Sequence, residues 1–301
     1  MKIEKFEDLL KQKIVAVHDG PFHSDEVLCL ALLRMLGYKG GYIRSRQKSI
    51  LEKYVGIDVQ DSATGSQFDH HGDAAEFGVC ALTKLWNWIE PQIHSEQSAR
   101  FGTSMHYAFQ AVADSDSGAK EPKLCNNMFD WIRIMNDGSD AMFACSVQMA
   151  ERILSSAWAK AGEWAATLKA AEIALKNAQE HNGVPVFCQK FAQAKEALYR
   201  LGCRIPFFVS PSGDGWAIIQ CAPPDLPYSS HSGFCPLPKA WAGLRDDEFQ
   251  KISGYKSARF GFNPGGGDCV MAFFGDMNDA IDAATKQAKA QLAAFRQEVK
   301  P

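Results

Sequence analysis

The sequence has little excess charge, no long apolar stretch and no paired cysteines. Its 32 Lys and Arg against 35 Asp and Glu leave a net charge of −3. This balance excludes a protein held to nucleic acid by overall charge, although a local basic groove could still bind a phosphate backbone. No stretch approaches the roughly 20 apolar residues that a membrane-spanning helix requires. The nine Cys residues form no C-x-x-C pair, so neither a disulfide framework nor a thiolate zinc site is expected.

Targeting segments, internal repeats and low-complexity tracts are also missing. The segment 1–13 mixes Glu and Asp with Lys. A secretory signal needs an apolar stretch and a mitochondrial transit peptide avoids acids, so neither is predicted. We therefore expect a cytoplasmic protein without membrane attachment. Its 46% hydrophobic and 22% charged residues are ordinary for a globular chain, and 301 residues correspond to about two domains at roughly 150 residues each.

Alternating short apolar runs and helical stretches predict an α/β domain at the N-terminus. The expected strands are 14–18, 42–45 and 56–59. The first two are joined by a helix, with Ser24 as its expected N-cap and Gly37 as its stop. Strand, helix, strand is typical of a parallel sheet. In such sheets ligands bind beyond the carboxyl ends of the strands, which is where His18 and Asp58 stand.

After a helix-rich middle, Gly and Pro residues separate a second set of strands. The stretch 139–181 is expected to form one long helix, or two with a break near Gly162. We place the domain boundary where it ends, so that residues 1–182 form the catalytic domain with its helical connection and residues 183–301 a smaller α+β domain. The strands expected there are 184–188, 205–210, 215–221, 258–262 and 269–274. An amphipathic helix is expected over 277–299.

Imidazole and carboxylate side chains are concentrated in the first 118 residues. They comprise the H-x-x-x-x-H-x-D pattern of His18, His23 and Asp25, then Asp58, then Asp69-His70-His71, then Asp114-Ser-Asp116-Ser-Gly118. A lone His is usually a polar surface group, but motifs that each fall at or beside a strand end are far more specific. The mixture suits Mn²⁺, Zn²⁺, Fe²⁺ or Co²⁺. There are more ligands than one catalytic ion needs, which predicts a two-metal site.

The order of these motifs resembles that of the DHH phosphoesterase superfamily, and more closely that of the melanocyte-proliferating-gene family of metal-dependent hydrolases. The segment VAVHDGPFHSDEVLCLALLR resembles the opening signature of this family. The segments GWAIIQC and PLPKAWAGLRDDEF resemble parts of its C-terminal domain. The resemblance implies a phosphoester hydrolase, most specifically a 3′–5′ exonuclease acting on single-stranded RNA. It also implies two bound divalent ions. Mn²⁺ is the expected ion, and Mg²⁺, Zn²⁺, Fe²⁺ and Co²⁺ are the alternatives.

The resemblance further assigns roles to residues of this chain. Its metal ligands would be His18, His23, Asp25, Asp58, His70 and Asp116. Asp58 would bridge the two ions, His71 would face the substrate phosphate, and Asp69 would orient an imidazole. Asp114 stands two residues before Asp116 and is the alternative candidate for the metal ligand of this motif.

Substrate contacts are expected from basic and glycine-rich segments. The candidates are Arg245, Gly265, Gly266, Gly267, Arg44 and Arg46. Arg245 lies in a stretch that resembles the family, and its guanidinium could chelate phosphate oxygens in a bidentate way. The glycines would let a substrate backbone come close because they lack a Cβ, with a plain hairpin turn as the alternative. The two arginines near the second strand either extend a basic path for nucleic acid or form a solvated face.

Two other classes of function are compatible with the sequence. The modest net charge suits a small-molecule phosphohydrolase, such as a manganese-dependent pyrophosphatase or a nucleotide phosphatase. The second class is a metal-binding regulatory protein that catalyses no reaction. The presence of a suitable residue at every expected ligand position argues against this class. A protease is not expected because no H-E-x-x-H motif is present. The expected partner is single-stranded RNA or a small phosphoester, with a second copy of the chain as a further candidate.

Overall fold

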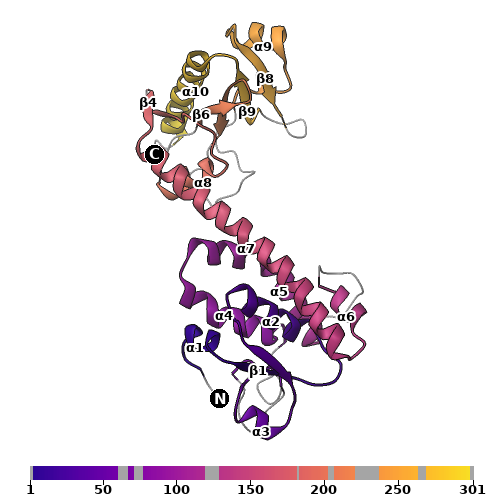
Figure 1. Cartoon of the computed structure of the whole chain (residues 1–301). Helices are drawn as coiled ribbons and strands as arrows, with labels where there is room; N and C mark the ends of the chain where they lie inside the picture. The colour runs from indigo at the N-terminus through magenta and orange to yellow at the C-terminus, as the bar shows by residue number, and fades with distance from the viewer. Residues whose placement is uncertain are drawn as a thin grey trace. The chain divides into compact units, whose positions relative to one another are not determined.

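The computed structural model describes residues 3–59, 67–70, 77–118, 129–181, 183–202, 207–220, 237–263 and 269–298. The chain divides into two compact units, residues 1–165 (unit 1) and 166–301 (unit 2), which we describe separately (Figure 1). The division falls within α7 (Asp140–Lys176), which is one uninterrupted helix. The sequence predicted a domain boundary at residue 182, where the second set of strands was expected to begin. That boundary stays a prediction.

Unit 1 is built on a three-stranded parallel sheet. Its strands are β1 (Ile14–Val17), β2 (Gly41–Arg44) and β3 (Val55–Ile57), in the order β2-β1-β3. Each lies within two residues of its expected position; β1 and β3 are short apolar runs that are mostly buried, whereas β2 is half-buried with an exposed first residue. The prediction of an α/β domain at the N-terminus is confirmed.

The helix α2 (Ser24–Met35) connects β1 to β2 and is buried over most of its length. The sequence predicted Ser24 as its N-cap, but the N-cap in the structure is His23. The reason is Glu26, at the third helical position, which accepts a hydrogen bond from the backbone N–H of His23 at 2.7 Å. The earlier start buries the carboxylates of Asp25 and Glu26 in the first turn.

Besides the first part of α7, unit 1 contains these further helices among the residues described. They are α1 (Phe6–Leu10), α3 (Lys48–Leu51), α4 (Ala81–Ile93), α5 (Glu96–Asp116) and α6 (Trp131–Met135). Both α4 and α5 pack against α2. Trp86 of α4 meets Phe101 and Phe109 of α5 edge to face, with ring centroids 5.2 and 6.4 Å apart. This aromatic packing fixes the direction of α5, whose last residue is Asp116.

Unit 2 is a mixed sheet with a long helix on it. Its strands are β4 (Gln179–His181), β5 (Val184–Val186), β6 (Phe207–Ser212), β7 (Gly215–Gln220), β8 (Ala258–Phe262) and β9 (Met271–Phe274), in the order β4-β5-β6-β7-β9-β8. Its helices are α8 (Ala194–Arg200), the short 3₁₀ helix η1 (Lys239–Trp241), α9 (Asp246–Ser253) and α10 (Met277–Glu298). The last of these packs against β5, β6, β7 and β9. The α+β character is confirmed, although β4 lies where a helix was expected. None of the helices, over the residues described, is long and apolar enough to span a bilayer.

Candidate metal centre

Four elements of unit 1 end or begin at one edge of the parallel sheet. β1 ends just before His18, β3 ends just before Asp58, α2 begins just after His23, and α5 ends at Asp116. Because β1 and β3 are parallel neighbours, the residues that follow them meet at the same edge. The distance from Nε2 of His18 to Oδ2 of Asp58 is accordingly 3.5 Å.

Asp58 occupies the centre of this edge in an unusual backbone conformation. Its φ is +53°, in the left-handed region that Asp and Asn tolerate better than most side chains. The Asp58 N–H donates to the carbonyl of Phe68 at 3.2 Å, which brings the segment 67–70 alongside. The two carboxylate oxygens then face different imidazoles, with Oδ1 at 3.3 Å from Nε2 of His70 and Oδ2 facing His18. This is the position that a shared carboxylate requires.

His70 is surrounded by carboxylates. Its Nε2 lies 2.8 Å from Oδ2 of Asp116 and 3.8 Å from Oδ2 of Asp25. Burial by itself lowers the pKa of His70, but the hydrogen bonds to Asp116 and Asp58 outweigh it and raise that pKa to about 10. The surrounding carboxylates therefore favour a positive charge at this position.

Asp25 and Glu26 are completely buried acids. Oδ2 of Asp25 accepts a hydrogen bond from the N–H of Ala81 at 3.3 Å, and Oε1 of Glu26 lies 2.7 Å from Nε2 of His18. The other oxygen of each carboxylate, Oδ1 of Asp25 and Oε2 of Glu26, has no hydrogen-bond donor among the residues described. Burial, followed by the charge of Asp58, raises the pKa of both groups. A bound cation would offset both the burial and the repulsion.

The donor set could hold metal ions. Within three groups of residues the ligand atoms lie within 4.8 Å of one another: His18, His23, Glu26 and Asp58; His23, Asp25 and Asp116; Asp25, Asp58 and His70. His23, Asp25 and Asp58 each belong to two of these groups. Shared ligands are also a feature of sites in which two metal ions lie side by side. Imidazole nitrogen with carboxylate oxygen suits Mn²⁺, Zn²⁺, Fe²⁺ or Co²⁺.

The structure brings all six predicted metal ligands together and adds Glu26 to them. The signal in the sequence was the three-residue spacing from His23 to Glu26, which matches a capping box. Of the two competing acids, Asp116 belongs to the cluster. Oδ1 of Asp114 instead accepts a hydrogen bond from Nε2 of Gln110 at 2.9 Å. Metal ligation by these residues stays a prediction.

The structure describes one of the two remaining members of the D-H-H motif, Asp69. Asp69 is partly buried, and its backbone carbonyl accepts a hydrogen bond from Nζ of Lys84 at 2.6 Å. It belongs to none of the three groups of ligand atoms, so its orienting role stays a prediction. His71 lies outside the described residues.

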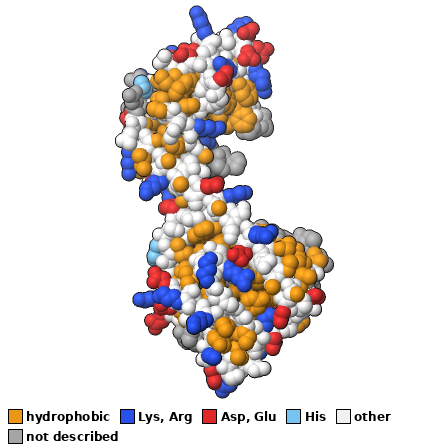
Figure 2. All heavy atoms as spheres, in the orientation of Figure 1, with side chains coloured by type: hydrophobic (Ala, Val, Ile, Leu, Met, Phe, Trp, Pro, Cys, Tyr) orange, Lys and Arg blue, Asp and Glu red, His pale blue; other side chains and the backbone are white. Residues whose placement is uncertain are grey.

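The residues predicted to bind substrate lie in different surroundings. The side chain of Arg46 is 45% exposed, 3.8 Å from Asp19. Arg245 is exposed, precedes α9 and lies over the ring of Phe260 at 4.5 Å. The Gly265–Gly267 triplet lies outside the described residues. On the face shown in Figure 2, acidic and basic side chains are interspersed, so we expect substrate binding to depend on local contacts.

The side chain of Arg44 is bonded to other parts of unit 1, which argues against a direct contact with substrate. Its side chain is only 6% exposed and donates hydrogen bonds to the carbonyls of Gly20 and Gly138 and to Asp140. The guanidinium also lies 4.9 Å from the centre of the Phe143 ring. These contacts tie the loop between His18 and His23 to the start of α7.

We expect Arg44→Ala to lower the free energy of unfolding by about 1–3 kcal/mol, because the mostly buried guanidinium would lose its hydrogen bonds to the carbonyls of Gly20 and Gly138. The pair with Asp140 adds little, since the Asp140 side chain is 84% exposed. Urea denaturation measures the loss, with Arg46→Ala as the control that should cost less than about 1 kcal/mol. If Arg44→Ala weakened substrate binding at unchanged stability, Arg44 would be a substrate contact after all.

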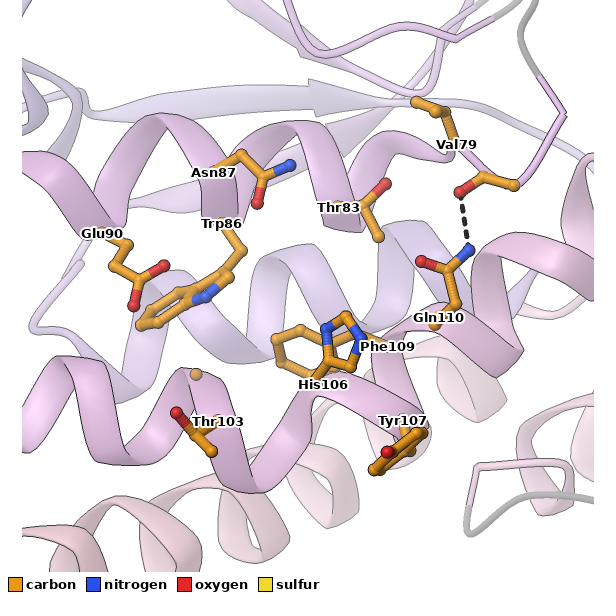
Figure 3. Close-up of a pocket in the computed structure, with 12 residues that line it drawn as sticks. Val79, Thr83, Trp86, Asn87, Glu90, Thr103, His106, Tyr107, Phe109 and Gln110 are labelled. Atoms are coloured by element: carbon orange, nitrogen blue, oxygen red, sulfur yellow. Dashed lines mark hydrogen bonds between the residues drawn. The ribbon is translucent and has the colours of Figure 1, made fainter. Parts of the chain in front are cut away.

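Of two pockets lined by described residues of unit 1, the smaller borders the metal cluster and the larger does not. The larger, of about 580 Å³, lies between α4 and α5 and is lined by Thr83, Trp86, Glu90, His106, Tyr107 and Gln110, among others (Figure 3). No residue of the cluster lines it, and its one carboxylate, Glu90, would repel a phosphate. The smaller pocket, of about 310 Å³, is lined in part by His23 and Asp116. A phosphoester that reaches the cluster is therefore expected in the smaller pocket.

The chain matches one family model over most of its length. Residues 14–85 and 88–272 match the model MYG1_exonuc, described as an uncharacterised protein family (UPF0160). The chain is 27% identical over 269 residues to a MYG1 protein of Chlamydia pneumoniae, covering 82% of this chain and 88% of the relative. It is 25% identical over 307 residues to the MYG1 exonuclease of Homo sapiens, covering 82% and 79%.

Among solved structures, a pGpG-specific phosphodiesterase from Vibrio cholerae aligns with 94% of this chain and 99% of its own, at 11% identity. The TM-score of 0.33 is too low for this alignment to support an argument about fold or function.

Proposed function

Because this chain belongs to the MYG1_exonuc family (UPF0160), the melanocyte-proliferating-gene family that its motifs predicted, we propose that it is a metal-dependent phosphoester hydrolase. We further propose that it releases nucleotides from the 3′ end of single-stranded RNA. The observation that carries the proposal is the cluster of His, Asp and Glu side chains at the edge of the parallel sheet. The name of the human relative, an exonuclease, supports nucleic acid as the substrate class.

The chain's own residues would hold two divalent ions, with Mn²⁺ as the first choice. The ligands would be His18, His23, Asp25, Glu26, Asp58, His70 and Asp116. Bound cations would lower the pKa of a water molecule and neutralise the charge that develops on the phosphoryl group. Asp58 would belong to both positions, since its oxygens face different imidazoles. Glu26 would position His18 and the start of α2 through the contacts of its Oε1.

Exposure of the cluster indicates the side from which substrate arrives. The side chains of His18, Asp25, Glu26 and Asp58 are at most 2% exposed, while that of His23 is 52% exposed. Asp116, at 13%, is also reached by solvent. The substrate phosphate would therefore approach beside these two residues. In this proposal His71 would face the phosphate, and Arg245 with the Gly265–Gly267 triplet would contribute to substrate binding.

The test is an assay with RNA oligomers labelled at either end, in Mn²⁺ and after treatment with a chelator. We expect mononucleotides to be released from the 3′ end in Mn²⁺ and no product after chelation. Pyrophosphate hydrolysis without RNA cleavage would instead indicate a small-molecule phosphohydrolase. Bound metal without turnover of RNA, pyrophosphate or nucleotides would indicate a regulatory protein.

A further inference from the structure

The pocket beside His23 and Asp116 has the size of a subsite. Its volume of about 310 Å³ is at the lower end of the range for ligand sites, about 300–1,000 Å³. Buried Phe22 and Val112 contribute apolar wall, while Ser24 and Asn136 contribute polar groups. Such a space suits a single nucleotide and its phosphate.

Among the described residues that line this pocket, Arg133 on α6 is the only Lys or Arg. It is exposed, and its guanidinium forms no ion pair with the part of the chain that the structure describes. Arg44 differs in this respect, because its guanidinium is already bonded to Gly20, Gly138 and Asp140. Arg133 is therefore the arginine of this region that is available to an anion.

The position of Arg133 is fixed relative to the loop that carries His23. Ile132, its neighbour on α6, is completely buried. The helix is followed by Asn136, whose Nδ2 donates to the carbonyl of Phe22 at 2.5 Å and whose Oδ1 accepts from the N–H of Gly138 at 3.0 Å. Asn136 thus attaches the end of α6 to the residue before His23.

We propose that Arg133 binds the phosphate of a nucleotide that enters this pocket, directly beside the metal cluster. The inference rests on the proposed function and names a positively charged substrate contact within unit 1. A guanidinium can form two parallel hydrogen bonds with phosphate oxygens. Asp116 and Asp130 also line the pocket, and their charge repels an anion until cations neutralise the cluster. Nucleotide phosphate therefore binds after the metal ions.

The experiment is a calorimetric titration of AMP into protein loaded with Mn²⁺ and freed of excess metal. We expect Arg133→Gln to weaken AMP binding roughly 10- to 100-fold, the equivalent of a lost hydrogen bond to a charged group. Arg133→Lys should be intermediate, since it keeps the charge and loses the planar fork. The matched control is Arg152→Gln, an exposed arginine of α7 in unit 1 that does not line the pocket, which should bind AMP like the wild type. Manganese content should be equal in all four proteins.

Three results would overturn the inference: no AMP binding to the wild type, equal binding by Arg133→Gln, or loss of manganese from Arg133→Gln. AMP binding by metal-free wild type as tight as by loaded protein would contradict the order of binding. The RNA assay decides the proposed function separately. If the enzyme cleaves RNA but the Arg133 variants bind AMP like the wild type, only this inference is disproved. If AMP binding depends on Arg133 but no substrate is turned over, only the proposed function is disproved.

Discussion

Asp58→Asn should abolish turnover and remove at least one of the two proposed metal ions while the fold stays intact. A neutral amide cannot bridge two cations as a carboxylate does, and losing several kcal/mol of charge stabilisation corresponds to roughly 10³-fold or more in rate. The fold should tolerate the change because Asn has nearly the same shape. Asn also adopts the left-handed conformation of this position, where φ is +53°.

The matched control is Asp246→Asn. Asp246 also has a positive φ, +42°, but it is exposed at the start of α9 in unit 2. The same chemical change in the same backbone conformation should therefore leave rate and metal content unaltered. Rate, manganese content and melting temperature are measured for both variants. If Asp58→Asn kept two ions and the wild-type rate, Asp58 would not be the shared ligand.

Asp25→Asn should have opposite effects on stability with and without metal. Asp25 is completely buried, and burial together with the charges of Asp58 and Asp116 raises its pKa. In the metal-free protein, the amide removes this destabilising charge while its oxygen can still accept the Ala81 hydrogen bond. The melting temperature should then rise by a few degrees, since about 1 kcal/mol corresponds to roughly 2–4 °C for a domain of this size.

In saturating Mn²⁺ the order of the two proteins should reverse. A ligand at 100 times its dissociation constant adds about 2.7 kcal/mol to the stability of the wild type, and a variant that binds more weakly gains less. Melting curves with and without Mn²⁺ measure both effects. Asp8→Asn, an exposed change on α1, should shift neither curve by more than about a degree. A loss of stability in the metal-free Asp25→Asn protein would mean that Asp25 supports the fold and not a cation.

The sheet and most of the cluster could be predicted because their signals are local. His18 and Asp58 each follow a short β-branched run, and the rule that parallel strands end at one edge places them together. Glu26 was missed because its part in the cluster depends on the buried first turn of α2, which the choice of Ser24 as N-cap concealed. β4 was missed because its residues continue a helical pattern, while pairing with β5 decides their conformation.

The surroundings of the arginines of unit 1 could not be predicted from the sequence. In the sequence, Arg44 and Arg46 form one basic run, yet Arg44 is buried by partners near residues 20, 138 and 140. Arg133 stands in no motif at all. Its place beside His23 depends on the hydrogen bond from Asn136 to Phe22, across 114 residues of chain. Contacts at such separations depend on tertiary packing, which residue patterns within one segment do not encode.

Anomalous diffraction from crystals soaked in Mn²⁺ tests the two-metal centre most directly. The account predicts two manganese peaks about 3.5–4 Å apart, both contacted by Asp58, with imidazole and carboxylate ligands at roughly 2.0–2.2 Å. One of them should lie beside His23 and Asp116, at the mouth of the small pocket. Peaks more than about 6 Å from Asp58, or a single ion that Asp58 does not touch, would contradict it, because neither could form the ligand bonds of about 2 Å that a shared carboxylate requires.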